Sequence, residues 1–164
     1  MAGIYLSLGS SIGDRAQNIA RAIEALAIRD IRVLKRSSLY ETEPVGMREP
    51  EWFLNGVVEV QTELQPHELI RALLEIERSM GRSRAASPAR KLPRTIDMDI
   101  LFYGSQIIRE AGLEIPHSRM SERRFVLVPF AEIAPAAMHP VLKKTVAELL
   151  AGTPDRSEVR PWQS

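Results

Sequence analysis

Alternating apolar and polar positions predict four β-strands in the first two thirds of the chain. β-Branched and aromatic residues are frequent in these stretches, and turn-forming residues bound them. The predicted strands cover residues 4–8, 31–42, 53–62 and 93–103. Because side chains alternate along a strand, Phe53, Asn55 and Val57 are expected on one face of the third strand.

Two other stretches repeat apolar residues at helical spacing. Asp14 can cap the first helix, which carries Ile19 and Leu26 on one side. Pro66 can begin the second helix, and Gly81 can end it. The order strand, helix, strand, strand, helix, strand is typical of a ferredoxin-like βαββαβ sandwich, an α+β fold. We therefore expect a mainly antiparallel sheet with helices on one face and substrate loops on the other.

Shorter elements are predicted for the last third of the chain. Residues 106–110 and 113–115 can form a hairpin, a helix can begin at 121–124, and a short helix can cover 145–150. Residues 153–164 are expected to be a loose tail. The sequence shows no linker or internal repeat, so we expect one domain in residues 1–152 followed by this tail.

The fourth predicted strand carries two carboxylates two residues apart. Period two places Asp97 and Asp99 on the same face, about 6.6 Å apart along the strand. That separation suits divalent metal ions spaced ~3.5 to 4 Å apart. The two faces are expected to hold Asp97, Asp99, Leu101 and Tyr103 on one side and Ile96, Met98, Ile100 and Phe102 on the other, in the core.

An alternative for this strand is an edge strand whose charges discourage aggregation. Two neighbouring aspartates repel each other, however, and Arg94 supplies a single compensating charge. A bound metal would compensate both carboxylates, so we favour the metal-site interpretation.

A basic segment precedes the aspartates. Residues 82–94 contain five basic side chains and no acidic one, and arginine forks neutralise phosphate oxygens in the same way that divalent cations do. As an alternative, such a segment is a solvated loop without function.

Residues 43–52 are expected to form a second long loop. Asn55 beside Phe53 suits a flat heterocycle, although Asn55 could equally well end a strand ladder. Metal, phosphate and ring sites together favour phosphoryl-type transfer from a nucleotide.

Composition excludes several other classes of function. The 164-residue chain has a formal net charge of +1, which provides no general attraction for nucleic acid or an anionic membrane. It contains no cysteine, which excludes disulfides and cysteine-ligated zinc. No apolar stretch approaches the roughly 20 residues that span a bilayer, and the first residues do not resemble a signal peptide. We expect a cytoplasmic monomer that acts on small molecules.

Several stretches together resemble one enzyme family, the 6-hydroxymethyl-7,8-dihydropterin pyrophosphokinases of folate biosynthesis. The similarity is strongest at Pro93–Leu101, which contains both aspartates. It also extends over Leu8–Asp14, Ser37–Gly46, Phe53–Asn55, Glu77 with Gly81–Arg84, Ile115–His117, Arg123, Phe125 and Glu132–Pro135. The resemblance therefore covers roughly residues 4–150.

The resemblance implies an ATP- and magnesium-dependent enzyme that transfers the β,γ-diphosphate of ATP to the pterin hydroxymethyl group. It implies that Asp97 and Asp99 hold two Mg²⁺ ions, and that Arg84, Arg94 and the two aspartates are catalytic. The implied ATP contacts are Glu77, Arg82, Arg84, Arg90, Arg94, His117 and Arg123. The implied pterin contacts are Thr42, Pro44, Val45, Phe53, Asn55 and Phe125, with the two phenylalanines stacked on the ring.

The sequence also admits two rival functions. A catalytically silent nucleotide-binding module would keep the fold and bind both substrates without forming AMP. A sugar-nucleotide transferase would also use a pair of aspartates, although the small size of the chain disfavours it.

Overall fold

The computed structural model describes residues 3–43, 52–81 and 95–163. The predicted βαββαβ order is confirmed, and it is followed by a hairpin, further helices and a last strand. The elements are β1 Ile4–Ser10, α1 Arg15–Ile28, β2 Arg32–Arg36, β3 Tyr40–Thr42, β4 Phe53–Gln61, α2 Pro66–Ser79, β5 Asp97–Tyr103, β6 Ile108–Glu110, β7 Leu113–Ile115, a 3-10 helix Met120–Glu122, α3 Arg124–Ile133, α4 Val146–Gly152 and β8 Val159–Pro161.

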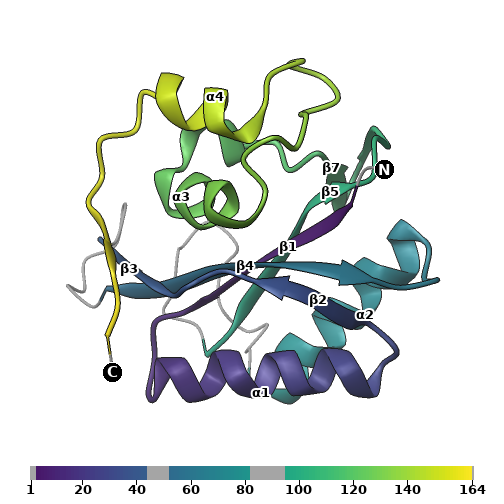
Figure 1. The fold of residues 1–164 in the computed structure, drawn as a ribbon. Helices are drawn as coiled ribbons and strands as arrows, with labels where there is room; N and C mark the ends of the chain where they lie inside the picture. The colour runs from purple at the N-terminus through teal and green to yellow at the C-terminus, as the bar shows by residue number, and fades with distance from the viewer. Residues whose placement is uncertain (1–2, 44–51, 82–94, 164) are drawn as a thin grey trace.

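The main sheet is antiparallel and has the strand order β5-β1-β4-β3-β8, with β2 also paired to β4 (Figure 1). Strand β1 lies in the middle, between β4 and β5, although it comes first in the chain. A separate two-stranded sheet pairs β6 with β7, as the sequence predicts. None of the helices in the described ranges is both long and apolar enough to cross a membrane.

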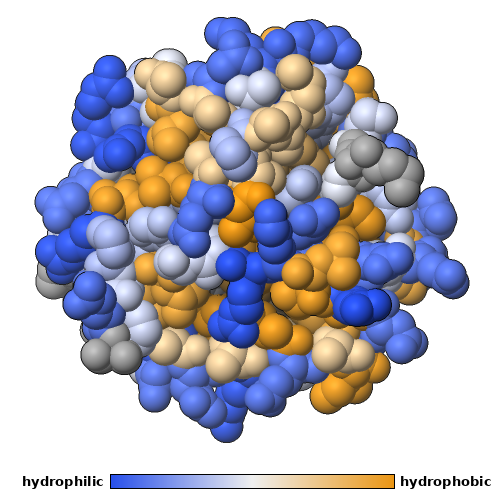
Figure 2. All heavy atoms as spheres, viewed as in Figure 1, coloured by the Kyte–Doolittle hydropathy of each residue, from blue (hydrophilic) through white to orange (hydrophobic). Residues whose placement is uncertain are grey.

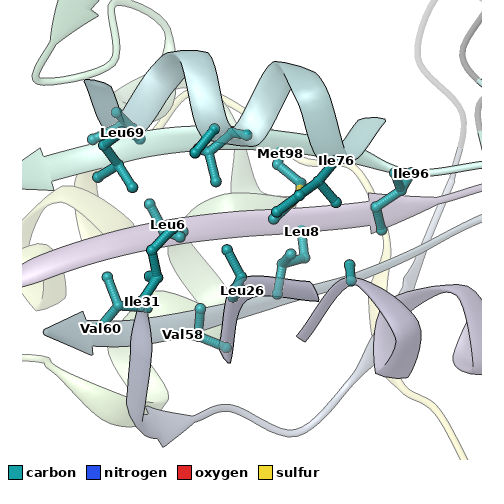
Figure 3. Packing of buried hydrophobic residues seen from close by; sticks show 14 of the residues in the cluster. Leu6, Leu8, Leu26, Ile31, Val58, Val60, Leu69, Ile76, Ile96 and Met98 are labelled. Carbon is teal, nitrogen blue, oxygen red and sulfur yellow. The ribbon is translucent and has the colours of Figure 1, made fainter. Parts of the chain in front are cut away.

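Helices α1 and α2 cover one face of the sheet (Figure 1). Leu6 and Leu8 of β1 point between Leu26 of α1 and Ile76 of α2, and these side chains are at most 2% exposed (Figure 3). Val58 and Val60 of β4, with Met98 of β5, extend the same core. This packing keeps α1 and α2 against one apolar side of the strands.

The local signals for both helices are confirmed. The Asp14 carboxylate accepts a hydrogen bond from the Gln17 backbone N–H (3.1 Å), which satisfies a donor at the start of α1. At α2 the Glu68 side chain accepts from the Gln65 N–H (2.8 Å), and Pro66 takes the first helical position. Gly81 follows α2 with φ of 100°, a conformation that favours glycine.

The first two predicted strands have different boundaries in the structure. The single strand expected over residues 31–42 is divided into β2 and β3, because Ser37 bonds to β4 through its side chain. The Val57 N–H donates to Ser37 Oγ (2.9 Å), and the Ser37 N–H donates to the Val57 carbonyl (2.9 Å). Strand β1 was expected to end at Leu8 but continues to Ser10, since Gly9 remains paired on both sides.

The second face of the sheet also carries helices. Tyr5, Val57 and Phe102 form an apolar area there, and α3 and α4 cover it (Figure 1). The prediction that Phe102 shares a face with Met98 and Ile100 is wrong. A bulge pairs Tyr5 with Phe102 and Leu6 with Ile100, so Leu101 is skipped and the alternation shifts.

The end of the chain is ordered where a loose tail was expected. Strand β8 pairs antiparallel with β3 at the edge of the sheet. The Asp155 carboxylate accepts from the Arg124 N–H (2.8 Å) at the start of α3, and Thr153 Oγ1 donates to the Ser121 carbonyl (2.9 Å). These contacts connect the segment to the last helices and to the strand edge.

In the view of Figure 2, hydrophobic residues lie in patches separated by hydrophilic ones, and hydrophilic residues occupy most of the outline.

Candidate active site

The part of the second sheet face that α3 and α4 leave open is polar. Strand register places Asp97 of β5, Gly9 of β1, Asn55 of β4 and Tyr40 of β3 in one row across four strands. Directly paired residues share a face, and neighbouring strands lie about 4.8 Å apart. The carboxylates and the Asn55 amide therefore lie on the same face, about two strand spacings apart.

The two aspartates lie at the start of β5. Asp97 is opposite Gly9 and Asp99 is opposite Ser7, and both aspartates are partly exposed. Between them, the Met98 N–H donates to Glu77 Oε2 (2.7 Å), and Glu77 is only 1% exposed. Helix α2 thus fixes the backbone that carries the two aspartates.

His117 lies beside the second aspartate. Its Nε2 is 3.9 Å from Asp99 Oδ2, and its backbone N–H donates to the Leu101 carbonyl (3.1 Å). Its Nδ1 accepts from the Arg119 N–H (3.2 Å), so a neutral ring carries its proton on Nε2, which faces Asp99. Burial, and next the positive charge of Arg123, hold the pKa of His117 below its ordinary value.

A hollow of about 240 Å³ opens beside this pair. Asp99, His117, Glu114 and Ser118 supply its polar lining, and Ile70 and Leu113 supply part of its apolar lining. The hollow therefore lies against one of the two aspartates and against the histidine.

The other end of the row holds a buried polar pair, Asn55 and Thr42. Asn55 Nδ2 donates to Thr42 Oγ1 (2.7 Å), and both residues are buried. A Cβ atom at Gly9 would lie 2.7 Å from Asn55 Oδ1, so the glycine leaves the space that this amide occupies. Phe53 follows on the same face of β4. Phe125 lies in the first turn of α3, and the Arg123 guanidinium carbon is 5.5 Å from its ring centroid.

The structure brings together eight of the predicted site residues on or beside this face: Asp97, Asp99, Thr42, Asn55, Phe53, His117 and, near the start of α3, Arg123 and Phe125. Glu77 is placed differently, because it is buried beneath β5 and bonded to its backbone. Pro44, Val45, Arg82, Arg84, Arg90 and Arg94 lie outside the described residues.

Sequence reasoning missed the roles of three structural features around the site. Gly9 lies within a strand and makes room for Asn55, whereas the sequence indicated a turn. Tyr40 stands next to Asn55 and donates to Glu132 Oε1 from α3 (2.5 Å). Both Tyr40 and Glu132 fall in stretches that resemble the family, but nothing in their spacing indicates that they contact each other.

The aspartate pair is suited to magnesium. Mg²⁺ prefers oxygen ligands and is commonly held by one or two carboxylates, with water and substrate phosphates completing the shell. Over residues 3–43, 52–81 and 95–163, no group of three or more His, Cys, Asp or Glu side chains is placed to hold a metal ion.

The fold and site define a class of protein: a small α+β transferase whose carboxylate pair and polar pocket share one sheet face. A sequence model of the family 7,8-dihydro-6-hydroxymethylpterin-pyrophosphokinase (HPPK) matches residues 5–135. The chain belongs to this family.

Relatives with the enzyme name cover nearly the whole chain. The 2-amino-4-hydroxy-6-hydroxymethyldihydropteridine pyrophosphokinase of Methylorubrum extorquens is 45% identical over 92% of this chain and 93% of its own length. The Bacillus subtilis enzyme of the same name is 39% identical over 97% of this chain and 89% of its own length. The folic acid synthesis protein fol1 of Pneumocystis carinii is 44% identical over 88% of this chain, which spans only 19% of that relative.

Solved structures support the fold. The Plasmodium falciparum HPPK-DHPS crystal structure with pteroate superposes with a TM-score of 0.71 over 92% of this chain and 42% of that chain, at 17% identity.

Proposed function

We propose that the protein transfers the β,γ-diphosphate of ATP to the hydroxymethyl group of 6-hydroxymethyl-7,8-dihydropterin, giving AMP and the pterin diphosphate. One observation carries the proposal: Asp97 and Asp99 share a sheet face with the Asn55–Thr42 pair, across the gap left by Gly9. This arrangement supports a phosphate-bearing substrate at one end of the row and a flat heterocycle at the other.

In the proposed reaction the hydroxymethyl oxygen attacks the β-phosphorus of ATP. The bond from that phosphorus to the oxygen bridging the α- and β-phosphates breaks, AMP leaves with that oxygen, and the hydroxyl proton is released. The reaction needs no covalent bond to the protein. The protein contributes position and charge stabilisation, which dominate phosphoryl transfer.

We propose that Asp97 and Asp99 hold two Mg²⁺ ions. When bound, the ions neutralise phosphate oxygens and help to align the triphosphate for attack. Glu77 holds the backbone between the two aspartates through Met98, which keeps their spacing. The Nε2 side of His117 faces Asp99 and is suited to donate to a phosphate oxygen.

The remaining site assignments are proposals of the same kind. We assign ATP contacts to Arg82, Arg84, Arg90, Arg94, His117 and Arg123, with Arg84 and Arg94 also stabilising the charge that develops during transfer, whereas the buried Glu77 supports the backbone of β5 instead. We assign the pterin pocket to Thr42, Pro44, Val45, Phe53, Asn55 and Phe125. The Asn55 amide presents polar atoms to the edge of the ring, and aromatic rings offer stacking surfaces.

Product analysis tests this function. The purified protein is incubated with ATP, Mg²⁺ and the reduced hydroxymethylpterin, and nucleotides are separated by chromatography. AMP should accumulate in equal amount with the pterin diphosphate, and removing Mg²⁺ with EDTA should abolish both products. A silent binding module would bind both substrates but leave ATP intact, which would refute the proposal.

We further propose a monomer that works in the cytoplasm, where ATP and Mg²⁺ are both present. We assign the catalytic domain to residues 1–152 and treat residues 153–164 as a segment added to it. Light scattering of the purified protein tests the first point, and fractionation of cells tests the second.

A further inference from the structure

Four side chains from separate parts of the chain meet at the sheet edge behind the pterin residues. Glu41 lies next to Thr42 on β3, so its side chain points to the opposite face from Thr42. Its Oε2 is 2.9 Å from Arg15 Nη2 of α1, and its Oε1 is 3.5 Å from Arg160 Nε of β8. One carboxylate thus binds two guanidinium groups.

Both arginines also contact Trp52. Arg15 Nη1 donates to the Trp52 carbonyl (2.7 Å), and the Arg160 guanidinium carbon lies 4.2 Å from the centroid of the indole ring. The second contact is a cation–π interaction. Because Trp52 immediately precedes Phe53, the chain enters β4 with both its carbonyl and its ring fixed.

These contacts are partly shielded from water. The side chains of Glu41 and Arg15 are 21% and 24% exposed, whereas that of Arg160 is 51% exposed. Arg15 and Glu41 are therefore the inner part of the cluster. Arg160 closes it from outside, and it belongs to a strand beyond the residues that the family model matches.

We infer that Arg160 is a positioning residue for the pterin: by stacking on Trp52 and binding Glu41, it fixes Phe53 and Thr42 from the back of the sheet. This inference rests on the proposed pterin pocket. Strand β8 supports the position of Arg160, because its pairing with β3 places Arg160 directly opposite Glu41. Arg160 thereby supports the proposed pocket from outside the assigned catalytic domain.

The test compares Arg160→Gln with Arg156→Gln, both in the unmodified full-length background. Arg156 is the matched control because it lies in the same segment and its Nη1 donates to the Thr153 carbonyl (2.8 Å). In Arg160→Gln, the Kd and KM for the hydroxymethylpterin should rise about two- to fivefold, the range expected for an exposed cation–π contact. The Kd for ATP and kcat should stay unchanged, and Arg156→Gln should match the unmodified protein.

A double-mutant cycle identifies the route of the effect. If Arg160 acts through Trp52, Arg160→Gln should add little to the loss already caused by Trp52→Leu. Unchanged pterin affinity in Arg160→Gln would overturn the inference. Equal weakening of ATP and pterin, together with equal losses in Arg156→Gln, would also overturn it, because a general structural defect would explain both. If the unmodified protein neither binds the pterin nor forms AMP, the proposed function itself fails.

Discussion

At the scale of single residues, the site depends on Gly9, because a glycine has no side chain to fill the space beside Asn55. Gly9 lies between Asp97 and Asn55 in the row across the sheet, and a Cβ atom there would lie 2.7 Å from Asn55 Oδ1. That contact is too close, but its partner is the end of a flexible side chain. The expected cost therefore falls on the position of the amide more than on the fold.

Gly9→Ala should weaken pterin binding about tenfold, corresponding to ~1.4 kcal/mol, because the added Cβ displaces the Asn55 amide from the position in which it bonds to Thr42. Calorimetric titration with hydroxymethylpterin measures the change. Gly152→Ala is the control, since a Cβ atom at Gly152 would meet nothing within 4 Å. Pterin affinity equal to that of the control would show that Asn55 does not need this space.

At the scale of elements, the Glu132 carboxylate of α3 binds the chain between β2 and β3 and the first residue of β3. Glu132 Oε2 accepts from the Ser38 N–H (2.9 Å) and hydroxyl (3.0 Å), and Oε1 accepts from the Tyr40 hydroxyl (2.5 Å). Burial and the bond to Glu132 raise the pKa of Tyr40 to about 12. Burial opposes the charge on Glu132, but the bonds from Tyr40 and Ser38 hold its pKa below the ordinary value.

Glu132→Gln should lower the free energy of unfolding by about 1–3 kcal/mol at pH 7, because an amide cannot accept all three bonds equally well. Urea unfolding measures the loss, and Glu122→Gln, at an exposed position, is the control. The folded pKa of Glu132 lies below the unfolded value of 4.5, so its contribution is present above pH 4.5 and is lost as the pH falls further. A variant as stable as the control at pH 7 would contradict this role.

The elements that the sequence predicts correctly have local signals. The Asp14 cap, Pro66 and Gly81 mark the two long helices, and each signal involves residues within a few positions. Other features depend on contacts between distant residues. The bulge that turns Phe102 toward Phe130, the break at Ser37 and the pairing of β8 with β3 all require knowledge of the sheet register, which single-sequence periodicity does not contain.

The residues of the site also divide into those that a local sequence signal reveals and those that depend on contacts between distant residues. Asp97 and Asp99 are recognisable because their two-residue spacing is itself the signal for a shared face. The roles of Gly9, Tyr40 and Glu132 depend on strands and a helix that meet only in the folded chain. Glu77 is a mixed case: its place on α2 is predicted, but its burial against the Met98 backbone is not.

At the scale of the whole molecule, the buried His139 should make the free energy of unfolding depend on pH. It lies between α3 and α4 and is 6% exposed, and its ring centroid is 5.6 Å from that of Phe102. Its Nδ1 accepts from the N–H groups of Val141 (3.2 Å) and Leu142 (3.0 Å). Burial lowers the pKa of His139 from the ordinary value of 6.5, so the folded protein favours the neutral ring.

Because the unfolded chain takes up this proton first, the free energy of unfolding should fall as the pH drops below about 6.5. Above that pH the stabilisation is fully present. His139→Gln removes the titrating group, so the stability difference between the unmodified protein and this variant should shrink between pH 7 and pH 5. Urea unfolding at both pH values measures the difference, and a constant or widening gap would contradict the burial of a neutral histidine.

For the whole molecule, we propose that a metal-binding carboxylate pair and a pterin pocket lie on the same face of the sheet. The most direct measurement is the rate of AMP formation by Asp97→Asn and Asp99→Asn, with the exposed Glu63→Gln as control, each with ATP, Mg²⁺ and the reduced hydroxymethylpterin. Each aspartate variant should lose at least about a thousandfold in turnover, or ~4 kcal/mol, because a neutral amide binds Mg²⁺ weakly and the phosphate charge then stays uncompensated, while the melting temperature stays near that of the control. Turnover in either aspartate variant within a fewfold of the control would contradict the account.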